Sequence, residues 1–498
     1  MTVTLPLELL LQIAKHLKND ETSLAPCTSV CRSWQAAFEP FLYSNIAVYC
    51  GTHKQKGQRG ISLTQFQKLT SGDGAIRQTW VRTLEYDILT PYEILDWTTR
   101  KEIGNSKDYC VDNYIRKAND LAFQNAMVML FQVLRPWDQS GRLKIYLYLR
   151  GYRFNPAPEP YTQQSDIAGE YRWNYTNGHK FSIPPYRAQF INEISDLASI
   201  PCIEKLSFLN RDPSWDQHHQ ISTGAVQTIL QCCPRISELE LDLDEWVRPD
   251  HLGYIQARRA ALSSLIGSTP RSLRVLHYEG NADAPWKPAM PPLNVIPSGV
   301  DSMSSNLRDL SVHLRELKLM NTTIAYDFLC PLDKEGKPEP GSLHLNWPNL
   351  EILELESVPP WLPSGEPTFH NTPEAQAEID NVEDWEDVIC DAEAGWGWPE
   401  LRTEEHFHRL LISLGYAARR MPRLKTMKFE LESHHKFNLH LRNTVDEIIF
   451  GWKCHPGYQP DSRVAKAWNF TLDDVRTDFG YEVESFVVLR SWPPDTPI

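Results

Sequence analysis

Histidine and cysteine are the side chains of this chain that could ligate zinc or form a nucleophile–base pair. A tetrahedral zinc site needs four ligands, usually supplied as two closely spaced pairs. The clumps of histidine and cysteine lack a matching second pair, and the chain has no glycine-rich phosphate loop, G-x-S-x-G or H-E-x-x-H motif. We therefore expect no metal site, no cofactor and no catalytic residue. The clumps are His218-His219, His406 with His408, His434-His435 with His440, Cys454-His455, and Cys27 with Cys31.

A second distinctive stretch is acidic. Residues 374–393 hold nine acidic residues and no basic one, about two thirds of the formal net charge of −14. One interpretation is an exposed acidic loop, inserted at about 371–400. The other is a docking strip for a basic partner, with Trp385, Trp396 and Trp398 as anchors.

Length and composition limit the class of protein. A chain of 498 residues, 41% of them hydrophobic, is globular and too long for one ordinary core. Its net charge of −14 argues against nucleic-acid binding through a broad basic surface. The sequence shows neither a long apolar run nor a secretory signal, so we expect no membrane contact. Ten scattered cysteines indicate reduced thiols and a cytoplasmic or nuclear location.

The first 48 residues predict short helices with an apolar face too large to bury within themselves. Helical spacing predicts a first amphipathic helix, and Pro26 keeps any second helix short. A further helix is expected after Ser29, a good N-cap. The first apolar stripe consists of Leu10, Ile13, Ala14 and Leu17, with Leu9 beside it, and the later one of Val30, Trp34, Phe38 and Phe41.

This segment resembles the F-box, in particular that of fungal F-box proteins. The resemblance covers Leu5 to Ile46 and rests on Leu5-Pro6, Glu8-Leu9, Ile13, Leu17 and Val30-Cys31-Arg32-x-Trp34. It implies docking on the Skp-family linker of SCF (Skp–cullin–F-box) ubiquitin ligases and, through that linker, on cullin. Two departures, Pro26 within "APCTS" and the small Ala14, would weaken the interface without removing it. The linker-binding positions implied are Leu5, Pro6, Leu9, Ile13, Leu17, Cys31 and Trp34.

One pattern, aliphatic-x-x-aliphatic-x-apolar, recurs through the rest of the chain. From Ile203 its copies start 33, 37, 41, 36 and 74 residues apart. A proline stands two or three residues before several copies, and helical stretches precede several of these prolines. The copies are Val81/Leu84/Tyr86, Ile203/Leu206/Phe208, Ile236/Leu239/Leu241, Leu273/Leu276/Tyr278, Leu314/Leu317/Leu319, Leu350/Leu353/Leu355 and Leu424/Met427/Phe429, with Leu143 to Leu149 a looser one.

The repeating unit is therefore helix, proline turn, short strand and loop. The expected fold class is α/β, with a short all-α F-box at 1–48 followed at 61–498 by an irregular leucine-rich-repeat-like solenoid of parallel strands and helices. The units are longer than ordinary leucine-rich repeats. The alternative is an ordinary α/β domain in which several strands begin with the same residue pattern by chance.

Alternation along each strand directs some polar residues to the face opposite the apolar anchors. We expect this face to bind a target protein of basic character, because acidic residues are in excess there. The candidate target-binding residues are Glu240, Asp242, His277, Glu279, Lys318 and Glu354.

F-box and repeats together predict a non-enzymatic substrate-recognition subunit of an SCF-type ubiquitin ligase. Its partners would be the Skp-family linker, cullin through that linker, and a protein target. Two alternatives stay open: an F-box scaffold outside ubiquitination, and a hydrolase-like α/β enzyme, against which the missing catalytic motifs argue.

Overall fold

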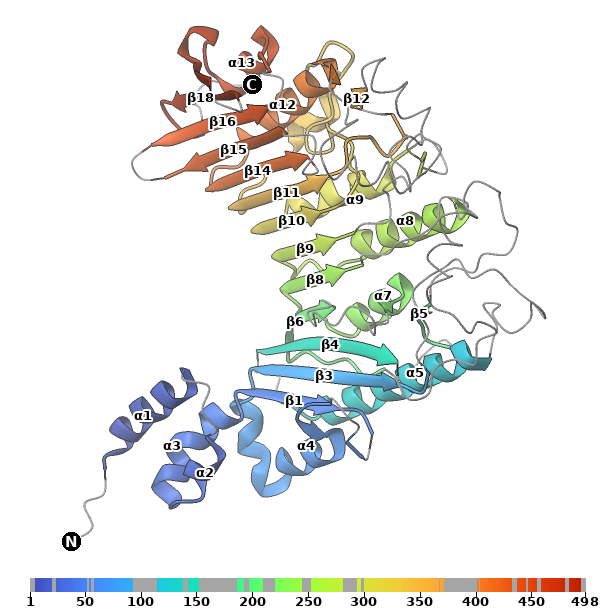
Figure 1. Cartoon of the computed structure of the whole chain (residues 1–498), viewed down its shortest axis with the longest axis vertical. Coiled ribbons are helices and arrows are strands. Elements are labelled where there is room, and N and C mark those ends of the chain that lie inside the picture. Colours follow the sequence, from blue (N-terminus) through green and yellow to red (C-terminus); the bar gives the residue numbers. More distant parts are fainter. Residues whose placement is uncertain are drawn as a thin grey trace, which may run out of the picture. The chain divides into compact units, whose positions relative to one another are not determined.

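The computed structural model of the chain is shown in Figure 1, whose element labels are kept below. It divides into two compact units, which are described separately. The first comprises Met1–Leu95, Asp112–Glu159 and Tyr186–Glu240, and the second Asp96–Val111, Pro160–Pro185 and Leu241–Ile498. The residues that the structure describes are 5–19, 24–51, 53–54, 58–92, 114–137, 142–151, 186–191, 197–208, 220–243, 252–280, 293–296, 300–366, 368–370, 401–402, 404–431, 437–444, 447–454, 458–479 and 483–493.

The first unit begins with three helices and continues as a parallel sheet. The helices are α1 (Leu7–Asn19), α2 (Ala25–Thr28) and α3 (Arg32–Leu42). The sheet has the order β2-β1-β3-β4-β6, and every neighbouring pair is parallel. In chain order, the strands of the unit and its remaining helices are β1 (Asn45–Tyr49), β2 (Ile61–Ser62), α4 (Leu63–Leu69), η1 (Gly72–Thr79), β3 (Thr83–Thr90), α5 (Tyr114–Leu134), β4 (Leu143–Gly151), β5 (Arg187–Ala188), β6 (Ile203–Phe208), β7 (Gln220–Ile221) and α7 (Thr223–Gln231). The strand β8 (Glu238–Asp242) follows where the chain passes from the first unit to the second.

Strand β4 shows why these segments form a sheet with one covered face. Leu143, Ile145, Leu147 and Leu149 are buried, and Lys144, Tyr146 and Tyr148 between them are half-buried. This period of two is typical of a strand whose one face packs on a core. Helix α5 supplies part of that core: the hydroxyl of Tyr86 on β3 donates to the carbonyl of Ala126 on α5 at 2.9 Å.

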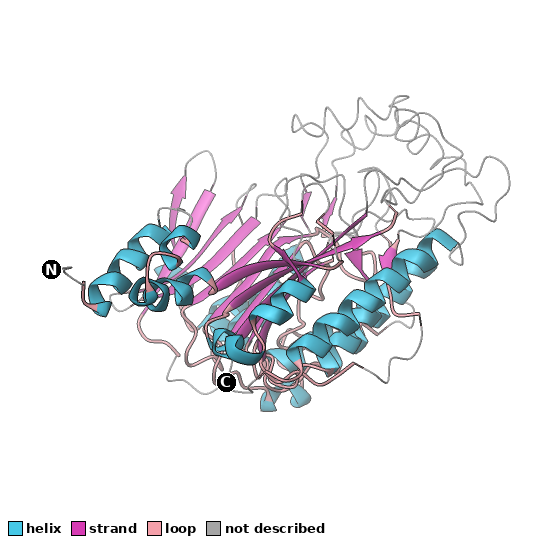
Figure 2. Ribbon diagram, turned by 90° about the horizontal axis from the view of Figure 1, so that it is seen from below, coloured by secondary structure: helices cyan, strands magenta, loops and turns pink. Residues whose placement is uncertain are grey.

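The second unit contains a sheet that is parallel in one half and antiparallel in the other. Strands β9-β10-β11-β14 are parallel, and β15-β16-β18-β17 continue the sheet from β14 in antiparallel order. Figure 2 shows helices and strands as separate layers. The elements are α8 (Leu252–Gly267), β9 (Val275–Glu279), α9 (Ser302–Ser311), β10 (Glu316–Met320), η5 (Pro340–His344), β11 (Ile352–Val358), β12 (Phe369–His370), β13 (Leu401–Arg402), α12 (Glu404–Ala418), β14 (Thr426–Leu431), β15 (Phe437–Asn443), β16 (Ile448–Cys454), α13 (Ser462–Trp468), η6 (Leu472–Asp474), β17 (Arg476–Phe479) and β18 (Val483–Leu489).

The strand register aligns the recurring aliphatic residues. In the second unit, Leu317 pairs with Leu276 and with Leu353, and Leu353 pairs with Met427. All four side chains are buried. In the first unit the equivalent pairs join Leu84 to Ile145 and Ile145 to Leu206. The prediction that these residues occupy equivalent buried positions on neighbouring parallel strands is confirmed for these pairs.

The expectation of parallel strands up to residue 498 is wrong beyond β14. Only five residues separate the end of β14 at Leu431 from the start of β15 at Phe437. A parallel crossover needs about a dozen residues or more, so this connection can only form an antiparallel pair. The triplet Leu307/Leu310/Val312 also has the recurring spacing, only seven residues before Leu314. It is not a separate strand, because Leu307 and Leu310 lie in helix α9.

Within the described ranges, no helix combines the length and the apolar character that a membrane crossing requires. The acidic stretch 374–393, with Trp385, Trp396 and Trp398, lies outside the described residues, as do His218-His219 and His434-His435.

Candidate functional site

The three N-terminal helices pack around a small core of their own. Leu10 and Ala14 of α1, Ala37 and Phe38 of α3, and Leu24 before α2 are buried together. Leu10 and Ala14 are four residues apart, so they lie on one side of α1 and face α3. The apolar stripe predicted on α1 is therefore partly an internal contact.

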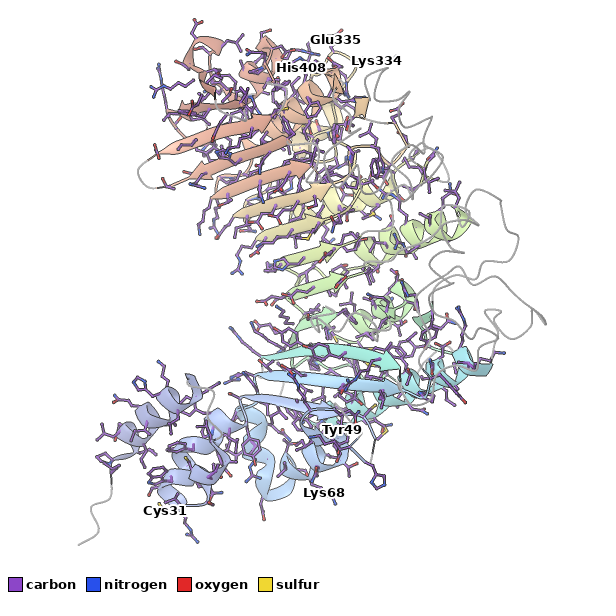
Figure 3. The ribbon with its side chains drawn as sticks, in the orientation of Figure 1. Cys31, Tyr49, Lys68, Lys334, Glu335 and His408 are labelled. Atoms are coloured by element: carbon purple, nitrogen blue, oxygen red, sulfur yellow. The ribbon has the colours of Figure 1, made fainter. Side chains whose placement is uncertain are left out.

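A second set of apolar side chains on the same helices is exposed. Leu5, Leu7, Leu9 and Val30 keep 42%, 46%, 45% and 61% of their surface accessible. Pro6 and Cys31 are exposed as well, and Cys31 is labelled in Figure 3. Single exposed leucines are common on protein surfaces, but a group of them gathered on one small helical domain is typical of an interaction site.

The predicted linker-binding residues divide into two groups. Leu5, Pro6, Leu9 and Cys31 are exposed. The other three, Ile13, Leu17 and Trp34, are partly buried and pack against the helical core. Trp34 also stacks on Phe38, with 5.1 Å between the ring centres.

Sequence reasoning missed Leu7 as a surface residue and placed Val30 in a packing stripe. Helical phase separates Leu9 from Leu10 and Ala14, because adjacent residues of a helix point in different directions. It does not identify Leu7, which lies three residues before Leu10 on the same side of α1. Leu7 is exposed at the first residue of the helix, outside the helical core.

The helix boundaries correct one expectation and agree with another. Helix α2 has four residues, with Pro26 in its first turn, as expected of a short helix. Ser29, however, ends α2 instead of capping α3, because its backbone N–H bonds to the carbonyl of Pro26. The N-cap of α3 is Cys31, whose side chain makes no capping bond.

Predicted target-binding residues of β9, β10 and β11 are linked through Glu316 by a hydrogen bond to a histidine and by ion pairs to a lysine. Nε2 of His277 lies 2.9 Å from a carboxylate oxygen of Glu316, and Nζ of Lys318 lies 3.3 Å from Glu316 and 2.9 Å from Glu354. These are neighbouring strands, so opposite charges stand beside each other across the ladder. Glu279 is half-buried at the end of β9.

The same contacts alter the ionisation of this face. Burial alone would raise the pKa of Glu316, but the bond from His277 and the charge of Lys318 outweigh it and lower the pKa. Burial would likewise lower the pKa of Lys318, yet the contacts with Glu354 and Glu316 raise it. Ionised forms are therefore favoured on both sides of the pair.

Glu240 lies differently from the rest of the predicted set. It is 6% exposed and accepts a short bond from Nζ of Lys205, which is also buried. A carboxylate buried in such a pair is not available to a partner without breaking the pair, which is costly. Asp242, at the end of β8, is half-buried.

Among the described residues, no group of three or more histidine, cysteine, aspartate or glutamate side chains is placed to hold a metal ion.

Residues 2–48 match the family model named F-box-like. This chain carries an F-box-like domain. The matched range covers α1, α2, α3 and the exposed apolar group, and such a domain suggests a general role as an SCF adaptor that binds a Skp-type linker. No curated protein matches the sequence. One solved structure, an inactive double mutant of MutB in complex with isomaltulose, aligns with 83% of this chain and 90% of its own at 9% identity and a TM-score of 0.15, which is too low to carry an argument.

Proposed function

We propose that this chain is the substrate-recognition subunit of an SCF-type ubiquitin ligase. The observation that carries the proposal is the group of exposed apolar side chains, Leu5, Leu7, Leu9 and Val30, on the F-box-like domain. A Skp-family linker would cover this group and connect the chain to cullin. Other subunits would perform catalysis, and this chain would contribute positioning and effective concentration.

The target would bind to the leucine-rich-repeat-like part of the chain. Its proposed binding face is the one opposite the buried leucines, with His277, Glu279, Lys318 and Glu354 on it. Because two glutamates, Glu316 and Glu354, flank Lys318 there, the face favours a partner with basic character. This role needs no catalytic group in the chain, and it places the protein in the cytoplasm or nucleus, where these ligases act.

Linker capture tests the proposal directly. The chain should co-purify with a Skp-family linker when the two are co-expressed. Changing Leu5→Ala together with Leu9→Ala should weaken capture by about thirtyfold or more, since truncating one hot-spot side chain costs roughly 2 kcal/mol.

A matched control is Leu472→Ala with Val488→Ala. Both side chains are 46% exposed, and both lie outside the F-box-like domain. Capture by this variant should equal that of the native chain. If the two double variants behave alike, or if the native chain ignores the linker, the proposed function is wrong.

A substrate receptor differs from a scaffold in what happens to its partners. Purifying the chain from its own cells with and without proteasome inhibition should reveal a partner that accumulates, ubiquitin-modified, only under inhibition. A partner present in equal amount and unmodified in both samples would support the scaffold instead.

A further inference from the structure

A line of charged residues crosses the amino-terminal edge of the parallel strands in the second unit. Arg274, Arg315, Glu351 and Lys425 each follow directly a fully buried leucine. The backbone N–H of Arg315 bonds to the carbonyl of Arg274, that of Glu351 to Arg315, and that of Lys425 to Glu351, at 2.7, 2.8 and 2.9 Å. Hydrogen-bonded strands lie about 4.8 Å apart, so the four residues form a row with that spacing.

Two further arginines flank this row in the turns that precede the strands. Arg271 stands three residues before Arg274, and Arg423 two before Lys425. We call Arg271, Arg274, Arg315, Glu351, Arg423 and Lys425 the basic edge.

The basic edge is exposed and its charge is unbalanced. All five cations are exposed, against one half-buried carboxylate, in a chain whose net charge is −14. The carboxylate of Glu351 is 2.7 Å from Nζ of Lys425. In the part of the chain that the structure describes, Arg271, Arg315 and Arg423 have no ion-pair partner within 4.0 Å.

The cations act together on the one carboxylate among them. The pKa of Glu351 is lowered, first by the hydrogen bond from Lys425 and also by the charges of Lys425, Arg315 and Arg423, which together outweigh the opposing effect of burial. These side chains therefore share one positive field, although they come from strands far apart in the sequence.

We propose that the basic edge binds an extended acidic segment of a protein partner. Such a segment would run across the amino ends of β9, β10, β11 and β14, with its carboxylates toward Arg271, Arg274, Arg315 and Arg423. Carboxylate and guanidinium groups form bidentate, charge-assisted hydrogen bonds, and arginine predominates in the row. The proposal rests on the proposed function in one respect: the acidic segment would belong to the target of the ligase, in a part of the target other than the basic part that contacts Lys318 and Glu354.

The narrow, linear arrangement of the cations favours a polypeptide over a nucleic acid as the ligand. The basic edge is one residue deep, and the next residues along β10 and β11 include Glu316 and Glu354. A nucleic acid distributes phosphates over a wider surface and would approach these carboxylates. An extended peptide is narrow enough to contact the row alone.

Binding of a labelled peptide to the full-length chain, without linker, tests this assignment. The probe is a fluorescent peptide of about twelve residues in which glutamate alternates with serine. Its binding is measured by fluorescence anisotropy at low and at physiological salt concentration. Affinity should fall with added salt. Arg315→Glu with Lys425→Glu should weaken binding by about tenfold, the sum of several modest surface charge effects. Glu351→Gln should strengthen it.

The matched control is Lys334→Glu with Arg476→Glu. Both residues are exposed cations away from the basic edge, and Lys334 is labelled in Figure 3. This variant has the same net charge as the edge variant, so it should bind the peptide within about twofold of the native chain.

Three results would overturn the inference. The first is that both double variants weaken peptide binding equally, and the second is that the native chain does not bind the peptide. The third is that the native chain binds a single-stranded oligonucleotide more tightly than the peptide, and that only the edge variant loses this binding. Linker capture, measured on the same preparations, reports the proposed function separately, so either idea can fail while the other stands.

Discussion

The carboxylate Oε1 of Glu39 lies 2.9 Å from Nη2 of Arg77, and this ion pair joins helix α3 of the F-box-like domain to η1, just before strand β3. The second terminal nitrogen of the guanidinium, Nη1, donates to the carbonyl of Leu69. The same group lies 5.0 Å from the centre of the Tyr43 ring. One side chain thus ties the helices that would hold the linker to the start of the first sheet.

Replacing this side chain should destabilise the junction. Arg77→Ala removes the ion pair, the bond to Leu69 and the contact with Tyr43, and leaves Glu39 largely buried. We expect a loss of about 1–3 kcal/mol in the free energy of unfolding, measured by urea denaturation. Lys337→Ala, which breaks the exposed pair with Glu335, is the control and should leave the free energy of unfolding almost unchanged. If both variants lost the same free energy of unfolding, Arg77 would not connect the F-box-like helices to the first sheet.

Adjacent leucines on α1 should separate binding from folding. Leu9 is 45% exposed and Leu10 is 1% exposed. Leu9→Ala should weaken linker capture and leave thermal unfolding unchanged. Leu10→Ala should instead destabilise the helical domain by about 2–5 kcal/mol, because it leaves a cavity in the core. If Leu9→Ala destabilised the domain and Leu10→Ala only weakened capture, Leu9 and not Leu10 would be the residue on the inner face of the helix.

Strand β10 offers the same comparison in the second unit. Leu317→Ala should cost about 2–5 kcal/mol, since Leu317 is fully buried between Leu276 and Leu353. Its neighbour Lys318 is on the other face, in ion pairs that water can reach. Lys318→Ala should therefore cost less than about 1 kcal/mol. Chemical denaturation measures both, and a larger cost for Lys318 would contradict the assigned register.

The stability of this sheet should depend on pH through Glu316. Its pKa in the fold lies below the ordinary value of 4.5, because His277 and Lys318 outweigh the opposing effect of burial. Ionised Glu316 therefore stabilises the fold above that value, and the contribution is lost as the pH falls through the lower folded-state pKa. Glu316→Gln should be less stable at neutral pH and lose less stability on acidification below about pH 5.

Unfolding midpoints across an acid pH series provide the measurement. Asp473→Asn, which changes an exposed carboxylate in η6, serves as the control and should follow the native curve. Parallel curves for the native chain and Glu316→Gln would refute the role given to Glu316.

Several elements of the fold could be predicted from the sequence because they depend on local pattern. The spacing Leu314/Leu317/Leu319 favours a short strand with one buried face, and all three side chains are buried at or just before β10. Pro26 lies in the first turn of α2, where proline is tolerated, and it prevents the helix from starting earlier for an equally local reason. The residues that resemble an F-box lie within the range that the family model matches.

Other features depend on which strands become neighbours, and the sequence does not state this. The basic edge joins Arg274 to Lys425, about 150 residues apart. Both follow the first leucine of a copy of the recurring pattern, but the pattern does not show that their strands lie in one sheet. Glu240 was expected at the surface from strand alternation, but alternation cannot show that Lys205 comes close enough to bury it. The division of α1 into inner and outer leucines likewise depends on where α3 packs.

The antiparallel end of the second unit has a consequence for how copies of this chain behave in solution. A stack of parallel strands leaves the N–H and C=O groups of its last strand open, and another chain can add a strand there. Here the strands after β14 turn back on themselves and finish at β17, which has four residues and exposes Arg476 and Asp478. A border so short and so charged is a poor template for a neighbouring molecule. The sheet therefore ends in an edge strand that discourages another copy of the chain from adding a strand there.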